Sequence, residues 1–423
     1  MPKKAVPVSE LKPGMFVCEL DRPWLGTPFL LQGFCIETAE HVEALRRFCS
    51  HVYVDTERTA IDVAAHLSPA AQPDLIPGVP EAAPIAIPGR TDYRDETTIE
   101  EEMRAAKAVG NAFVDLLKSV QDDIRKHTVL DVRRVKGALL DMVDSVVRNP
   151  SALQLLTTLR QKDPHSVAYS MKVTITLVAF GRHLGCPPDL LEHLGLGGML
   201  LDVGKLRLPA ELLAKKAPLS GEEHRLMKRH VDLGIEILNT TPGMPEEVVA
   251  MVATHHERED GSGYPRGLGG DEISLLGKIA AIVDCFEDLT TDRALAPAAS
   301  PQEALQMLRH GRVRLFEAWL VDRFIQFMGL YPAGSLVELN TGEVAVTLAN
   351  RPGTPGGPTV MLILDPQKKP YAMRRVISLG DPEGDAVPRE VTETLESGTH
   401  GIHPCDYLRD AVERLAAAQR ALG

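Results

Sequence analysis

The residues best suited to chemistry lie between Thr254 and Gly267, in the run Thr-His-His-Glu-Arg-Glu-Asp-Gly-Ser-Gly-Tyr-Pro-Arg-Gly. Two adjacent histidines and three acids stand there with almost no aliphatic residue, a composition that a buried core helix does not need. Imidazole and carboxylate groups are the usual donors for divalent first-row metals. The alternative is an exposed polar loop in which His255 and His256 do nothing, and for a lone histidine that alternative would be preferred.

Four further residues of ligand or phosphate-binding type lie inside apolar helical sequence. Asp202 and Lys205 are three apart in Leu-Leu-Asp-Val-Gly-Lys, which predicts that they share one helical face. His230 lies in Lys-Arg-His-Val-Asp-Leu-Gly, and Asp284 lies in Ala-Ile-Val-Asp-Cys-Phe. An unpaired charge in such surroundings is costly. A capping or salt-bridged role explains Asp284 alone better, whereas convergence on a metal explains the whole set better.

The elements that must position these residues are helices. Thr97-Thr98-Ile99-Glu100 predicts a helix cap with an acidic first turn, and an apolar stripe follows it from Met103 to Leu117. Between Asp95 and about Met328 no strand alternation is visible, so this part predicts an all-α domain. The further helical segments are Val132–Val147, Ser166–Leu184, Asp189–Leu201, Gly221–Leu238, Glu246–His256, Gly277–Leu289 and Pro301–Met328.

Two smaller parts flank the helical domain. We expect a small α+β module at 1–66, a Pro- and Ala-rich linker at 67–95, the all-α domain at 96–330 and a C-terminal extension at 331–423. The module is predicted to hold strands at Met15–Leu20, Phe29–Ile36 and His51–Asp55 and a helix at Ala39–Phe48. The extension is predicted to hold a hairpin of Ser335–Leu339 with Glu343–Thr347, a strand at Val360–Leu364 and an alanine-rich helix at Tyr407–Leu422.

Composition limits the possible functions. The chain has 423 residues and a net charge of -12, which argues against binding a nucleic-acid polymer but not against a small pocket for one anion. Six cysteines without a CxxC pair are typical of reduced thiols in a cytoplasmic protein. The first residues lack the apolar run of a signal peptide, and Met171–Phe180, the most apolar segment, is too short to span a bilayer.

The combined motifs resemble the HD-GYP family, a branch of the HD phosphohydrolases that hydrolyse cyclic di-GMP. The resemblance covers about 160–330 and rests on Asp-Val-Gly-Lys, on Leu-Ser-Gly-Glu-Glu-His with His230 after it, on His-His-Glu-Arg-Glu-Asp-Gly-Ser-Gly-Tyr-Pro, and on Ile-Val-Asp-Cys-Phe-Glu-Asp-Leu-Thr. The run Ser-Glu-Leu-Lys-Pro-Gly-Met-Phe-Val is similar to a module that often precedes such domains. The resemblance implies a mainly α fold with an HD-superfamily helical domain and a role in bacterial signalling.

The resemblance also implies roles for individual residues. It makes Asp202 the carboxylate that bridges two cations and makes Asp284 a ligand of the first cation. Three imidazoles complete the ligand set of the second cation. The resemblance places Lys205 near the scissile phosphate and makes Arg293 a contact of ligand phosphate. The three imidazoles are those of His230, His255 and His256, and the loop that names the family is Gly263, Tyr264 and Pro265.

The sequence departs from the family at the first cation. Leu201 stands where the family has the histidine of its His-Asp pair, and Tyr169 stands where it has another ligand histidine. His165 replaces an acidic ligand of some members, and Ala294-Leu295-Ala296 lacks a second basic phosphate contact. Tyr169 could bind a metal only as phenolate, against an ordinary pKa of about 10. One well-formed site for iron or manganese is therefore expected instead of two.

Three hypotheses follow from this asymmetry. The favoured one is a degenerate HD-GYP protein that binds cyclic di-GMP or a partner protein with weak or no hydrolysis. The second is an active cyclic di-GMP phosphodiesterase that works with one metal or with His165 as a replacement ligand. The third is a scaffold whose Gly-Tyr-Pro loop contacts a signalling protein such as a diguanylate cyclase. A homodimer is a further possibility that the sequence leaves open.

Overall fold

The structure of the protein is a computed structural model. It describes residues 3–8, 11–12, 15–20, 34–36, 42–43, 45–46, 49, 51–55, 84–126, 130–158, 167–215, 217, 219–291, 298–312, 314–350, 357–379, 388–404, 406–408 and 411–412. The chain divides into two compact units. The first comprises Met1–Ala82, Pro209–Lys228 and Arg293–Pro297, and the second comprises Ala83–Leu208, Arg229–Asp292 and Ala298–Gly423.

The first unit contains an antiparallel sheet with the strand order β1-β4-β2-β3. Its strands are β1 (Lys3–Pro7), β2 (Phe16–Leu20), β3 (Phe34–Cys35) and β4 (His51–Asp55). The predicted strands at 15–20 and 51–55 are confirmed, whereas β1 was missed because Pro2 and Pro7 obscure its alternation. Most of the helix predicted at 39–48 and the beginning of the strand predicted at 29–36 lie outside the described residues. Buried Val17, Leu45 and Val52 belong to the small core of this part.

Two short helices, α7 (Ala210–Leu213) and α8 (Gly221–Lys228), also belong to the first unit. None of the residues of α8 is buried. The prediction of a single helix from Gly221 to Leu238 was wrong, because the helical hydrogen bonding is interrupted at Arg229 and α9 (His230–Asn239) begins after it. Both segments consist of ordinary helix formers, so spacing alone did not reveal the break.

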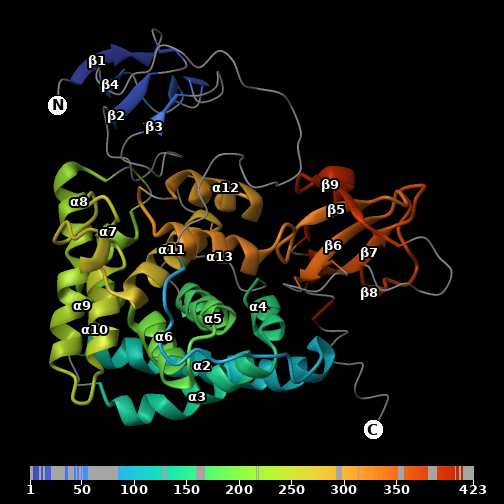
Figure 1. Ribbon diagram of the computed structural model, residues 1–423, viewed down its shortest axis with the longest axis horizontal. Helices are drawn as coiled ribbons and strands as arrows, with labels where there is room; N and C mark the ends of the chain where they lie inside the picture. Colours follow the sequence, from blue (N-terminus) through green and yellow to red (C-terminus); the bar gives the residue numbers. More distant parts are fainter. Residues whose placement is uncertain are drawn as a thin grey trace. The chain divides into compact units, whose positions relative to one another are not determined.

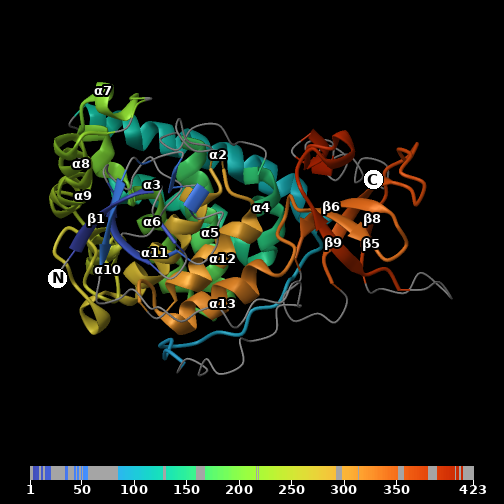
Figure 2. The same cartoon turned by 90° about the horizontal axis from the view of Figure 1, so that it is seen from above.

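The second unit is built around α5 (Val167–Leu184), which is buried over most of its surface. A helix that is apolar on nearly all sides belongs in the interior of a helical domain. Figures 1 and 2 show it surrounded by other helices. Its neighbours are α2 (Ile99–Arg125), α3 (Val132–Arg148), α4 (Pro150–Thr158), α6 (Pro188–Leu200), α11 (Leu275–Leu289) and α13 (Ala318–Met328).

Local signals in the sequence explain several helix boundaries. Thr98 caps α2 as predicted: its hydroxyl accepts a hydrogen bond from the backbone of Glu101, whose carboxylate accepts one from the Thr98 backbone. Ser300 caps α12 (Pro301–Gly311) in the same way. The last predicted helical stretch, Pro301–Met328, contains two helices, α12 and α13. The remaining elements of this part are the 3₁₀ helices η2 (Val203–Arg207) and η3 (Gly270–Glu272) and helix α10 (Glu246–Thr254). The prediction of a mainly helical domain is confirmed.

The C-terminal part is an antiparallel sheet of five strands in the order β8-β7-β6-β5-β9. The predicted hairpin is formed by β5 (Leu336–Leu339) and β6 (Val344–Ala349), and the predicted third strand is β7 (Thr359–Leu364). The sequence analysis missed β8 (Val376–Ser378) and β9 (Val391–Leu395), because both are short and neither is fully buried. Figure 1 shows this sheet beside the helices, where β6 contacts α4.

Two sequence expectations concern the whole chain. Among the described helices, none is long and apolar enough to cross a membrane. Of the cysteines that the structure describes, Cys49 and Cys186 are buried free thiols and Cys285 is a partly buried one.

Candidate metal centre

Four side chains meet at one point, as the sequence predicted for its second cation. The metal-binding atoms of Asp202, His230, His255 and His256 all lie within 4.8 Å of one another. His230 Nε2 is 3.3 Å from Asp202 Oδ1, and both His230 and His255 are almost fully buried. Three imidazoles and one carboxylate are a donor set that suits a divalent first-row cation.

Packing of η2 on α9 brings Asp202 and His230 together. Gly204 lies so close to α9 that an added Cβ atom would be 1.9 Å from the His230 carbonyl oxygen and 2.6 Å from the Gly234 nitrogen. Only glycine permits this approach, which explains the glycine of the Asp-Val-Gly-Lys motif. Asp202 and Lys205, which were predicted to share one helical face, form an ion pair with Lys205 Nζ 2.7 Å from Asp202 Oδ2. The segment that carries it is 3₁₀ rather than α-helical.

The end of α10 orients the other two histidines. The helix stops at Thr254, and His255 and His256 follow directly. His255 Nδ1 is 2.7 Å from the Val252 carbonyl oxygen, so Nδ1 carries the proton and Nε2 keeps its lone pair for a cation. The buried Nε2 has no hydrogen-bond partner among the described residues. A cation held by the four side chains would satisfy it, so the residues present fit a metal.

The Gly-Tyr-Pro loop folds back over this cluster. The buried Glu257 carboxylate accepts hydrogen bonds from the backbone N–H groups of Arg266 (2.8 Å) and Leu268 (3.1 Å), which fixes the return of the loop. The Tyr264 ring stacks on the His256 ring with centroids 4.6 Å apart and planes at 23°. The loop therefore forms one wall of the cluster.

At the positions that the family resemblance assigns to a first cation, the structure shows a hydrogen bond. The Tyr169 hydroxyl lies 3.1 Å from Asp284 Oδ1, and both side chains are buried. Leu201 is 2% exposed and offers no donor atom. Asp284 does not belong to the group of four mutually close donors. At two positions where the resemblance predicts imidazoles, the protein thus has a phenol and an aliphatic side chain.

The pKa values of the acidic groups in the centre differ strongly from their ordinary values. Burial, with the carboxylates of Asp202 and Asp288, raises the pKa of Asp284 to about 7. Burial would also raise the pKa of Asp202, but the Lys205 ammonium and the neighbouring histidines hold it well below its ordinary value. Burial keeps the pKa of Tyr169 well above 10, so this residue remains a neutral phenol.

The histidine rings are held neutral. Burial and the neighbouring imidazole of His230 lower the pKa of His255 to about 3. Burial and the adjacent ring of His255 lower the pKa of His256 well below its ordinary value. Neutral imidazoles are the form that binds a cation.

The structure brings most of the predicted residues together, but two fall outside its described part. His165 and Arg293 lie among the residues that are not described, so their roles stay predictions. Three residues near the centre were missed: Asp288, which contributes to the pKa of Asp284, and Lys172 with Glu287, which pair beside it. The sequence could have revealed Asp288, because it lies four residues after Asp284 on α11 and residues at that spacing share one helical face.

Comparison with known families identifies the helical part. Residues 154–318 match the family described as HD domain, and residues 3–135 match a domain of unknown function, DUF3391. The helical fold, the clustered histidines and aspartate, and this match define an HD-domain protein.

Comparison with curated proteins narrows the class. A cyclic di-GMP phosphodiesterase of Pseudomonas aeruginosa is 29% identical over 386 residues, covering 89% of both chains. The cyclic di-GMP phosphodiesterase response regulator RpfG of Xanthomonas campestris is 32% identical over 41% of this chain and 46% of its own. A 3'3'-cGAMP-specific phosphodiesterase of Vibrio cholerae is 38% identical over 30% of this chain and 24% of its own. The chain is similar to cyclic dinucleotide phosphodiesterases, and its helical part to the HD domain on which HD-GYP proteins are built.

Proposed function

We propose that this protein binds cyclic di-GMP at an HD-GYP centre with one cation and hydrolyses it weakly or not at all. The observation that carries the proposal is the buried hydrogen bond from Tyr169 to Asp284, together with the buried aliphatic side chain of Leu201. The neutral phenol is a poor ligand, and its bond engages the carboxylate that the family assigns to the first cation.

The remaining cluster supports a single cation held by Asp202, His230, His255 and His256. When bound, a divalent cation supplies Lewis-acid polarisation of phosphate oxygens and a lowered pKa for water. Because Lys205 is paired with Asp202, a cation bound by the cluster would supply the positive charge that favours an anionic ligand at this wall. A loss of about 4 kcal/mol of transition-state stabilisation would reduce the rate roughly a thousandfold.

A second candidate is an active phosphodiesterase. It is favoured by the Pseudomonas aeruginosa relative, which is named as a phosphodiesterase and aligns with 89% of this chain. Hydrolysis would then proceed with one cation or with a ligand from the residues that the structure does not describe. Binding to a diguanylate cyclase and homodimer formation stay predictions from the sequence.

Three measurements on the full chain separate these functions. Iron and manganese are counted per folded chain after purification with each metal, cyclic di-GMP binding is measured by calorimetry, and hydrolysis is followed with added manganese or iron. We expect about one cation per chain, saturable binding and little linear product. Two cations with rapid hydrolysis would establish the active enzyme. A cation without any dinucleotide binding would favour the protein-binding scaffold.

A further inference from the structure

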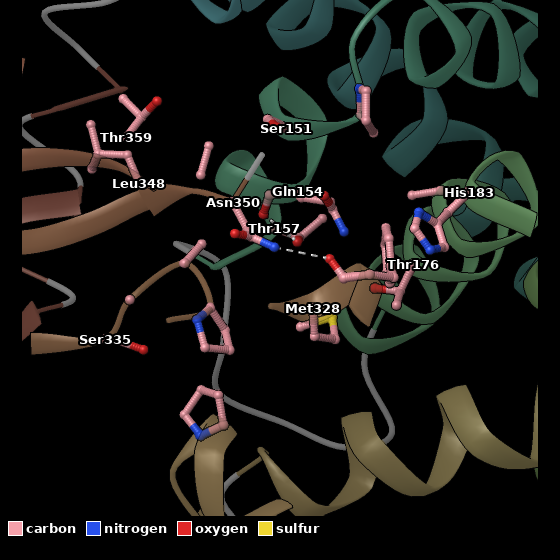
Figure 3. A pocket seen from close by; sticks show the side chains of 18 of the residues that line it. Ser151, Gln154, Thr157, Thr176, His183, Met328, Ser335, Leu348, Asn350 and Thr359 are labelled. Atoms are coloured by element: carbon pink, nitrogen blue, oxygen red, sulfur yellow. Dashed lines mark hydrogen bonds between the residues drawn. The ribbon is translucent and has the colours of Figure 1, made fainter. Parts of the chain in front are cut away.

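A cavity of about 1600 Å³ opens between the helices and the C-terminal sheet, and none of the four candidate metal ligands lines it. Ser151, Gln154 and Thr157 come from α4, and Thr176 and His183 come from α5. Figure 3 shows these side chains facing Leu348, Asn350 and Thr359 of the sheet side. Cavities for small organic ligands commonly measure about 300–1,000 Å³, so the space is sufficient for one.

Charged groups at the floor of the cavity are already paired. Lys172 Nζ lies 2.6 Å from Glu287 Oε2 and 3.3 Å from the Thr290 hydroxyl, and Thr176 donates to Glu287 Oε1 at 2.7 Å. All four residues are buried. A ligand there meets a neutralised ion pair and therefore needs no charge of its own.

Uncharged groups in the wall are not all paired. The hydroxyls of Ser151 and Ser335 and the amide of Gln154 make no hydrogen bond to any residue that the structure describes. Ser335 is 6% exposed, so its hydroxyl has little contact with bulk water. Burial and the guanidinium groups of neighbouring arginines lower the pKa of His183 to about 4, which leaves this ring neutral with one donor and one acceptor.

The outer rim disfavours an anion. Apart from residues that cap helices or form ion pairs, its exposed charged residues carry three negative charges and two positive ones. They are Arg90, Arg94, Asp92, Glu96 and Glu396. The rings of His183 and Phe327, with centroids 5.6 Å apart and planes at 45°, supply aromatic surface beside the hydrogen-bonding groups. The cavity thus combines aromatic rings, neutral donors and acceptors, and no free cation among its described floor residues.

We propose that this cavity is a second ligand site, which binds an uncharged heterocyclic molecule of the nucleoside type. Ser151, Gln154 and Ser335 hydrogen-bond its polar edge, and His183 and Phe327 contact its ring. Ser151 and Gln154 are partly exposed, so their polar groups are accessible from the cavity, and a ligand with several donors and acceptors can hydrogen-bond them. None of the four candidate metal ligands lines the site, and ligand binding there does not depend on whether cyclic di-GMP is hydrolysed.

Calorimetric titration of the full chain with adenosine and guanosine tests the proposal, with AMP and GMP as the charged counterparts. We expect saturable binding of at least one nucleoside and about tenfold weaker binding of its monophosphate. Gln154→Met keeps the length of the side chain and removes its amide, so affinity should fall about three- to tenfold. Ser335→Ala should weaken binding in the same direction.

Two control variants define the location. Gln326→Met makes the same change at an exposed residue of α13 outside the cavity and should bind as the unmodified protein does. His255→Ala, which removes a candidate metal ligand, should keep nucleoside binding even if cyclic di-GMP binding is lost. The proposal is overturned if neither nucleoside binds, if Gln154→Met and Ser335→Ala both bind with full affinity, or if His255→Ala abolishes nucleoside binding.

Discussion

Restoring the two missing imidazoles should create a second cation site. In the double variant Leu201→His with Tyr169→His, two donors return next to Asp284, and the hydrogen bond of 3.1 Å that now engages this carboxylate is removed. We expect about two cations per chain instead of one. The measurement is elemental analysis of folded protein purified with manganese or iron supplied.

The stability of the variant should depend on metal to a degree that can be estimated. Replacing Leu201, which is 2% exposed, loses about 1.5–3 kcal/mol of apolar burial. The lost hydrogen bond of Tyr169 and a buried imidazole without a partner cost about 1.5–4 kcal/mol more. Without metal the variant should therefore unfold about 3–7 kcal/mol more easily. A cation at a concentration a hundred times its dissociation constant should raise the free energy of unfolding again by about 2.7 kcal/mol.

Calorimetric unfolding with and without chelator checks this estimate. The matched control is Tyr169→Phe, which removes the hydroxyl but adds no donor, and its cation count should stay at one. If the double variant binds no more cation than the unmodified protein, the assignment of Leu201 and Tyr169 to the first cation is wrong. A second cation in the unmodified protein would refute the reasoning as well.

Three further predictions concern single side chains. His255→Ala should reduce bound cation by at least about tenfold, measured by competition with a chelating dye, whereas full retention would exclude the cluster as the site. Lys172→Met leaves Glu287 buried without its cation and should lower the free energy of unfolding by about 3–5 kcal/mol, measured in urea; an unchanged midpoint would contradict the ion pair. Although burial opposes it, hydrogen bonds from Arg148 hold the pKa of Glu102 below its ordinary 4.5, so this pair stabilises the fold above pH 4.5 and loses that effect as pH falls through the lowered value. Glu102→Gln should accordingly cost about 1–2 kcal/mol at pH 7 and less at pH 3, because Arg148 is partly exposed; an equal cost at both pH values would contradict this.

The sequence alone determined the helical class of the central domain and the family. Apolar spacing and the Thr98 cap predicted most helices, because these signals depend on neighbours within one or two turns. The motifs carried the family resemblance, and they also showed that two imidazoles are absent at 169 and 201. The break between α8 and α9 and strands β8 and β9 escaped prediction, because hydrogen bonding and packing beyond the local window decide them.

Only the tertiary structure decided what the altered positions do. Tyr169 and Asp284 are 115 residues apart, and no spacing rule predicts that their side chains bond when a histidine is lost. The close approach of Gly204 to α9, the stacking of Tyr264 on His256 and the cavity beside the sheet likewise depend on how whole elements pack. Residue types fix which groups can bind a cation, because that chemistry is local. Which groups meet is a property of the folded chain, because segments distant in sequence must share one small volume.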